Sequence, residues 1–225
     1  MVMKPHEFWQ GIHAPSSFDL AGPHSGFFPV TLDDGRQLRL PIRPLADAEH
    51  ALASLIINQA SFSVVEALSD DLAAKLKPFE IDIVVGLPTL GLTLAAEVAR
   101  RLGHSRYVPL GTSRKFWYLE ELSVPMSSIT TQQQKRLYID PRMLPLLEGR
   151  RVALVDDVIS SGTSIIAGLS LLAASAIEPV VVGAAMLQSD RWRDKLADFG
   201  AQWPGRVQGV FTAPMLKKTG DGWIS

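Results

Sequence analysis

The sequence predicts an α/β fold: a central, mostly parallel sheet flanked by helices. Short runs of apolar, often β-branched residues occur without polar alternation, as expected of strands buried on both faces. The clearest runs are 81–86, 152–155 and 179–187. Segments with apolar residues at helical spacing follow these runs. Strands that alternate with helices imply parallel pairing through right-handed crossovers.

The composition allows one large domain, or a domain with an appendage, and excludes several classes of protein. The 225 residues carry a formal net charge of −1, so no global basic field exists to attract nucleic acid or an anionic membrane. No apolar run approaches the roughly 18 residues of a membrane span. The segment 1–11 does not resemble a secretory signal. Cysteine is absent, which excludes disulfides and thiolate chemistry and makes the cytoplasm the expected location.

The N-terminal third is expected to form an appendage over residues 1–78. Residues 1–26 are irregular in pattern, and 27–42 predicts a hairpin that turns at Asp33-Asp34-Gly35-Arg36. Two helices are predicted next, over 46–58 and 62–77, both ending before Pro78.

Residues 79–190 are expected to form the core. Its first strand, 81–86, leads through a tight loop into a helix over 92–102, which Gly103 closes, and then into a short strand at 107–110. Residues 191–225 are expected to form a small C-terminal hood, with a helix over 190–199, a last strand over 207–211 and an irregular tail.

The stretch from Val152 to Ser164 carries the strongest functional signal. An apolar strand over 152–155 is followed by Asp156 and Asp157, and a loop of hydroxyls around Gly162 then opens a helix. The free N–H groups and the dipole at a helix N-terminus favour an anion. Hydroxyls add donors, and the glycine allows close backbone approach. This order predicts a site for a phosphate monoester.

The two common nucleotide-binding loops do not fit this stretch. No Lys follows the glycine as in a Walker A loop, and one glycine is not a dinucleotide fingerprint. The simplest alternative is a surface Asp-Asp pair that caps the following helix. Carboxylates would repel a phosphate unless they serve another partner, and ribose hydroxyls or a divalent cation would be such partners.

These thirteen residues resemble the phosphoribosyl pyrophosphate (PRPP) signature of type I phosphoribosyltransferases. The resemblance covers roughly residues 80–190 and implies the fold of that family. It implies that Asp156 and Asp157 contact the ribose 2′- and 3′-hydroxyls. It also implies that the loop holds the 5-phosphate, through Ser160, Ser161, Gly162, Thr163 and Ser164.

The same resemblance assigns the loop after the first core strand to pyrophosphate. That loop comprises Leu87, Pro88, Thr89, Leu90 and Gly91. Many family members carry a basic residue here, whereas this chain does not, so backbone amides would have to serve instead. An ordinary strand-to-helix turn accounts for these five residues equally well.

Residues 111–140 form the least regular long segment, and long loops inside compact domains are usually functional. Its position matches the family's flexible catalytic loop, and Arg114-Lys115 matches a basic dipeptide common at the start of that loop. Cations here would close over the pyrophosphate leaving group. The alternative is a solvated hairpin whose charges protect a sheet edge. Gln132-Gln133-Gln134 stands where adenine-specific relatives place an acidic residue.

The resemblance implies transfer of a 5-phosphoribosyl group from PRPP to a nitrogenous base, with purines favoured and pyrophosphate released. It implies Mg²⁺ held by PRPP, with Asp156 and Asp157 as the only expected protein contacts, and a homodimer. Base stacking is expected from an aromatic ring, with three candidates: Trp223, Phe116 and Trp117. The alternative function is a PRPP-sensing regulator of the same fold without transferase activity. The base itself cannot be named from the sequence.

Overall fold

The computed structural model describes residues 3–126 and 135–225. Its central sheet has the strand order β10-β9-β8-β4-β5, with every neighbouring pair parallel. This confirms the predicted sheet. The strands are β4 (Ile83–Gly86), β5 (Val108–Pro109), β8 (Val152–Ile159), β9 (Val181–Gln188) and β10 (Val207–Ala213).

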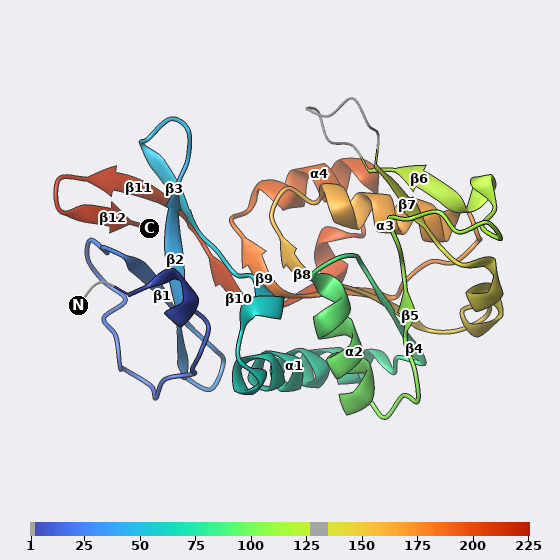
Figure 1. Cartoon of the computed structure of the whole chain (residues 1–225), viewed down its shortest axis with the longest axis horizontal. Helices are drawn as coiled ribbons and strands as arrows, with labels where there is room; N and C mark the ends of the chain where they lie inside the picture. The colour runs from blue at the N-terminus through green and yellow to red at the C-terminus, as the bar shows by residue number, and fades with distance from the viewer. Residues whose placement is uncertain (1–2, 127–134) are drawn as a thin grey trace.

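Helices cover both faces of this sheet (Figure 1). On one face, α1 (Phe62–Leu76) and α2 (Gly91–Arg101) share a hydrophobic cluster with Ala153 and Val155 of β8. On the other, α3 (Thr163–Ala173) and α4 (Arg191–Phe199) pack with the alternate residues of the same strand. Short 3₁₀ segments lie at Pro5–Glu7, Ile57–Gln59, Lys77–Phe79, Glu120–Leu122, Pro141–Leu146 and Pro204–Arg206.

The strand order reverses between β4 and β8. From β4 the chain first moves outward to β5, then returns to the other side of β4 to add β8, β9 and β10. In open α/β sheets the ligand crevice lies beyond the carboxyl ends of the strands at such a switch point. The loops 87–91 and 160–162 leave these two neighbouring strands, so the fold places them side by side.

A second sheet is antiparallel and has the order β1-β2-β3-β11-β12. We call these five strands the hood; it is larger than the C-terminal hood expected from the sequence. The predicted hairpin is confirmed as β1 (Phe27–Thr31) and β2 (Gln37–Pro44). The predicted helix over 46–58 is wrong, because that segment contains the strand β3 (His50–Ala53). The tail is not irregular either, since it forms β11 (Met215–Thr219) and β12 (Gly222–Ile224).

Local hydrogen bonds and strand pairing explain why β3 is not helical. The carboxylate of Asp47 accepts from the backbone N–H groups of Glu49 and His50, and this closes the turn after β2. The following strand then pairs with β2 on one side and with β11 on the other, where Ala51 faces Leu216. These tertiary pairings override the helix propensity of an alanine-rich segment.

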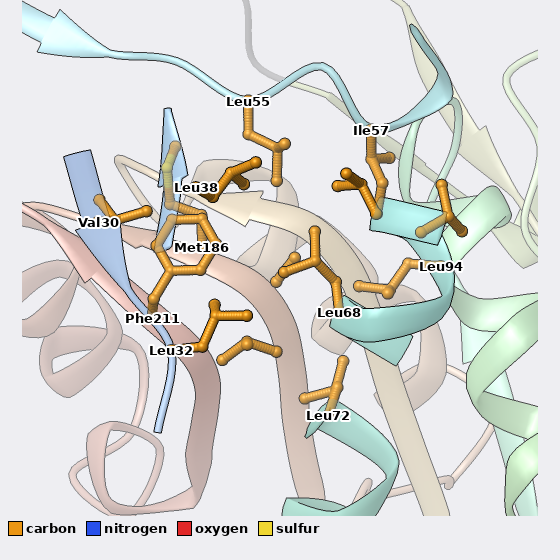
Figure 2. Packing of buried hydrophobic residues seen from close by; sticks show 14 of the residues in the cluster. Val30, Leu32, Leu38, Leu55, Ile57, Leu68, Leu72, Leu94, Met186 and Phe211 are labelled. Carbon is orange, nitrogen blue, oxygen red and sulfur yellow. The ribbon is translucent and has the colours of Figure 1, made fainter. Parts of the chain in front are cut away.

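The two ends of the chain therefore build one layer, whereas the sequence suggested a separate appendage and hood. A shared core fixes this layer to the parallel sheet (Figure 2). Val30 and Leu38 of the hood lie with Leu68 of α1 and with Met186 and Phe211 of the parallel sheet (Figure 2). The hood is thus held at the end of the strands where the crevice is expected.

The segment 111–140 holds a small antiparallel pair, β6 (Ser123–Pro125) with β7 (Arg136–Tyr138). The hydroxyl-rich middle of this segment and its three glutamines fall within 127–134, outside the described residues. In the described part of the chain, no helix is long and apolar enough to cross a membrane.

We predict that Leu38→Ala destabilises the whole protein, because Leu38 is 1% exposed in the core that joins both layers. Truncation of a buried leucine costs about 2–5 kcal/mol. Urea unfolding followed by circular dichroism should show that loss in a single transition. Leu20→Ala is the matched control, because Leu20 is 50% exposed. A separate early transition of the hood alone would contradict the shared core.

Candidate functional site

The two carboxylates of β8 are buried inside the sheet. The strand continues to Ile159, four residues beyond the predicted end, so the pair lies within the strand. Asp156 is 6% exposed and Asp157 is 8% exposed. The backbone N–H of Asp157 donates to Oδ1 of Asp156 at 2.9 Å. Side chains of adjacent strand residues point to opposite faces of the sheet, so the two carboxylates lie in different surroundings.

The N-terminus of α2 presses directly on Asp156. A Cβ atom added to Gly91 would lie 2.6 Å from Oδ1 of Asp156 and 2.8 Å from its Cα. The second of these contacts is with backbone, which cannot move aside, so only glycine fits. This contact brings the loop 87–91 and the acid pair together, as expected from the sequence. The peptide bond between Pro88 and Thr89 in this loop is cis.

Burial raises the pKa values of both carboxyls. The pKa of Asp156 lies well above its ordinary value, first because the group is buried and second because the carboxylate of Asp157 is adjacent. Burial also raises the pKa of Asp157. Two like charges this close resist full ionisation, so the pair titrates as a unit. Hydroxyl donors or a cation from a ligand would favour the charged forms.

The loop after β8 encloses a hollow of about 90 Å³ lined by residues 158–165. Gly162 stands at the N-cap of α3 with φ +76°, a left-handed conformation that L side chains rarely adopt. A Cβ atom there would meet Trp192 at an ordinary 3.5 Å. The turn itself therefore favours glycine here, and close approach of the backbone to a ligand stays a prediction. The first N–H groups of α3 face this loop.

The helix α4 contributes a residue that no sequence motif indicated. Nζ of Lys195 donates to Oγ1 of Thr163 at 2.6 Å, and Oγ1 of Thr163 lies 3.0 Å from Oγ of Ser161. Lys195 lies 32 residues after Thr163. The spacing of Trp192 and Leu196 predicts which face of this helix is buried, but it does not predict which loop Lys195 contacts.

Four of the remaining predicted residues, 114–117, lie at the base of the segment 111–140. Arg114 and Arg136 both pair with Glu120, at 3.3 and 3.4 Å. Lys115 is exposed. The side chains of Arg114 and Arg136 thus tie the two sides of this segment to each other.

Trp117 takes part in a second clamp at the same base. Its indole N–H donates to Oδ2 of Asp140 at 3.2 Å, and the guanidinium of Arg142 lies 4.4 Å from its ring centroid. Phe116, 96% exposed, packs edge-on against the same indole. One face of Trp117 is therefore occupied.

The third candidate for base stacking lies elsewhere. Trp223 belongs to β12, where its backbone exchanges hydrogen bonds with His24. In Figure 1 the strand β12 and the pair β6–β7 lie at opposite ends of the long axis. Trp223 therefore belongs to the hood sheet, whereas the indole of Trp117 contacts Asp140, two residues after β7.

The chain belongs to the phosphoribosyl transferase domain family, whose sequence profile matches residues 52–210. It is similar to hypoxanthine/guanine phosphoribosyltransferase of Methanosarcina mazei, with 27% identity over 62% of this chain and 68% of that protein. It is also similar to adenine phosphoribosyltransferase of Xanthomonas oryzae pv. oryzae, with 32% identity over 52% and 59%. Transcriptional regulator GfcR of Archaeoglobus fulgidus is 32% identical over 50% of each chain.

Solved structures show the same fold. Giardia lamblia adenine phosphoribosyltransferase, complexed with 9-deazaadenine, matches 67% of this chain and 80% of its own, with a TM-score of 0.56 and 21% identity. Matched segments span about half to two thirds of the curated relatives named above. The class of protein predicted from the β8 motif is thereby confirmed.

We predict that Asp156→Asn stabilises the fold. Its raised pKa means that the folded state binds a proton that the unfolded chain lacks between pH 3.8 and the raised value. Stability therefore falls as pH rises through that window. Asparagine does not titrate and can keep the bond from the N–H of Asp157.

The thermal midpoint of Asp156→Asn should exceed that of the wild type by a margin that grows from acidic to neutral pH. Asp190→Asn, at a carboxylate that is 86% exposed, is the control and should change little. A variant less stable than the wild type at neutral pH would contradict the raised pKa that burial gives this carboxyl.

The opposite sign is predicted for Asp140. Hydrogen bonds from Arg142, and then from Trp117, lower its pKa to about 2. Its stabilising effect is complete above pH 3.8 and is lost as pH falls through about 2. One pKa unit corresponds to about 1.4 kcal/mol, and screening of the exposed arginine reduces the total to about 1 kcal/mol.

Asp140→Asn should lower the free energy of unfolding by about 1 kcal/mol at neutral pH. The difference from the wild type should narrow in acid, as measured by urea unfolding with tryptophan fluorescence as the signal. A difference that stays constant from neutral pH into acid would rule out this electrostatic clamp.

Proposed function

We propose that this protein transfers a 5-phosphoribosyl group from PRPP to a nitrogenous base, preferably a purine, and releases pyrophosphate. One observation supports the proposal: two loops that each lead into the N-terminus of a helix flank a buried acid pair at the switch point of a parallel sheet. Two loops and two carboxylates correspond to the parts of PRPP, which are a phosphate monoester, a ribose and a pyrophosphate.

Each part of the substrate has a proposed partner. Asp156 and Asp157 accept hydrogen bonds from the ribose 2′- and 3′-hydroxyls, which compensates for burial of their charges. Ser160 to Ser164 and the first N–H groups of α3 hold the 5-phosphate. The loop 87–91, with the N-terminus of α2, holds the pyrophosphate through backbone amides.

The reaction breaks the bond between ribose C1 and the pyrophosphate oxygen and forms a bond from C1 to a base nitrogen, whose proton passes to pyrophosphate or water. The bonding electrons leave with pyrophosphate, and the positive charge that develops on the ribose needs no protein nucleophile. The chain's contribution is to orient the ribose and to stabilise charge on the leaving group. We assign the second task to Lys115 and Arg114, from the segment 111–140.

The residues present fit a Mg²⁺ ion that arrives with PRPP. Mg²⁺ favours phosphate oxygens, hydroxyls and water, with one or two carboxylates. Within residues 3–126 and 135–225, no cluster of three or more His, Cys, Asp or Glu forms a ready cage, and Asp156 with Asp157 is the carboxylate pair beside the loops. When bound, Mg²⁺ would supply neutralisation of the pyrophosphate charge.

The preference for purines rests on the relatives. Those with purine names include hypoxanthine/guanine, adenine and xanthine phosphoribosyltransferases, although an orotate enzyme also matches. Of the base-stacking candidates, we favour Phe116 and Trp223 over Trp117, since Arg142 already stacks on Trp117. We also propose that the protein is cytoplasmic and forms a homodimer.

A second function is favoured by one observation, the similarity to a protein named as a transcriptional regulator. In that case the chain would sense PRPP without turning it over. The two functions share the ligand and differ in turnover, so one assay separates them.

The test is pyrophosphate release from PRPP and Mg²⁺ with a panel of purine and pyrimidine bases. We expect turnover with at least one purine. Lys115→Ala should lower kcat with that base about a hundredfold, the effect of losing one charge-stabilising donor. Calorimetric affinity for PRPP should stay within a few-fold, because the interaction forms mainly in the transition state.

Lys217→Ala, at an exposed lysine of β11, is the matched control and should keep full turnover. No release with any base, together with PRPP binding that changes oligomeric state, would favour the sensor. Turnover that is unchanged in Lys115→Ala would leave the enzyme class in place and remove the role of that lysine.

A further inference from the structure

The helix α4 supports the loop around the hollow from the outside. Trp192 and Leu196 are 1% and 0% exposed, and a Cβ atom at Gly162 would lie 3.5 and 3.6 Å from them. Both residues belong to the hydrophobic cluster under the loop. Lys195 lies one position before Leu196 and three after Trp192, so two buried anchors hold its backbone beside the loop.

The lysine reaches the loop through one hydroxyl. Its Nζ donates to Oγ1 of Thr163 at 2.6 Å, and this oxygen lies 3.0 Å from Oγ of Ser161. An ammonium group is only a donor, so it occupies a lone pair of the threonine oxygen. The threonine hydrogen is then available to Ser161, and the serine hydrogen is available to the hollow. Both residues are among those that line that hollow.

The charges around the loop explain why a cation is needed at this place. The stretch from β8 through the loop carries no cationic side chain, and its only charged residues are Asp156 and Asp157. A phosphate dianion bound beside two carboxylates is opposed by their charge unless a cation is near. Among the described contacts, Lys195 supplies the cation that touches this loop.

We propose that Lys195 is a positioning residue for the phosphate monoester: it orients the hydroxyls of Thr163 and Ser161 as donors toward the ligand and offsets the negative field of the acid pair. This inference rests on the proposed function, because it deepens the assignment of the loop to the 5-phosphate. It adds a residue outside the β8 motif, from the next strand–helix unit of the fold.

The experiment measures calorimetric affinity for ribose 5-phosphate and for pyrophosphate in the wild type and in Lys195→Gln. We expect ribose 5-phosphate to bind about fivefold more weakly in the variant, near the upper end for an exposed charged contact. Pyrophosphate affinity should not change. Lys195→Arg should restore most of the affinity, because arginine keeps the charge and the donors.

A second readout separates charge from a purely structural role. The salt dependence of ribose 5-phosphate affinity should be shallower in Lys195→Gln than in the wild type, since one screened attraction is lost. The control is Arg193→Gln on the same helix, where the guanidinium pairs with Asp190 at 3.0 Å instead of with the loop. That control should match the wild type in both affinity and salt dependence.

A double variant tests the route through the threonine. Thr163→Val and Lys195→Gln together should cost less than the sum of the single losses, as expected for two groups in one hydrogen-bonded chain. Equal affinity and equal salt dependence of wild type and Lys195→Gln would overturn the role of the lysine while the loop assignment stands. Failure of the wild type itself to bind ribose 5-phosphate would instead overturn the proposed function.

Discussion

The burial of two adjacent carboxylates inside a parallel strand is the constraint on which this structure depends. A buried carboxylate costs free energy of folding unless it is protonated or paired with a partner. The raised pKa values of Asp156 and Asp157 reflect that cost. Among residues 3–126 and 135–225, buried carboxylates occur at one place, within β8 beside the switch point. There a ligand can compensate for it, and the N-terminus of α2 already lies against Asp156 through Gly91. Stability is thus given up at the place where we propose that PRPP binds.

The hood fixes the surroundings of this site. Because β3 pairs with both β2 and β11, strands from the two ends of the chain form one layer. That layer shares its core with α1, β9 and β10, so it cannot shift without disturbing the parallel sheet. The acid pair and the two loops are therefore held by rigid elements. The proposed contacts to the leaving group come from the segment 111–140, which Glu120 and Asp140 tie together at its base.

The parts that could be predicted from the sequence are those set by local pattern. The β8 motif, β4, α1 and the first hairpin follow from apolar periodicity and turn residues, and the family follows from thirteen residues. The strand β3 could not be predicted, because His-Ala-Leu-Ala has helical propensity and becomes a strand only through two distant partners. The strand β11 could not be predicted either, because it contains Lys217 and Lys218 and becomes a strand through its pairing with β3 and β12. Lys195 was missed because its contact depends on how α4 packs, which no local pattern records.

Proton release on ligand binding tests the central claim most directly. If binding of Mg²⁺ and PRPP ionises a carboxyl whose pKa burial has raised, calorimetry at a series of pH values above 3.8 should give heats that depend on the ionisation enthalpy of the buffer. We expect net proton release in the wild type and a smaller release in Asp156→Asn. In that variant, only the ligand and Asp157 can release protons. Equal proton release by the two proteins would contradict the claim that the buried acid pair receives the sugar.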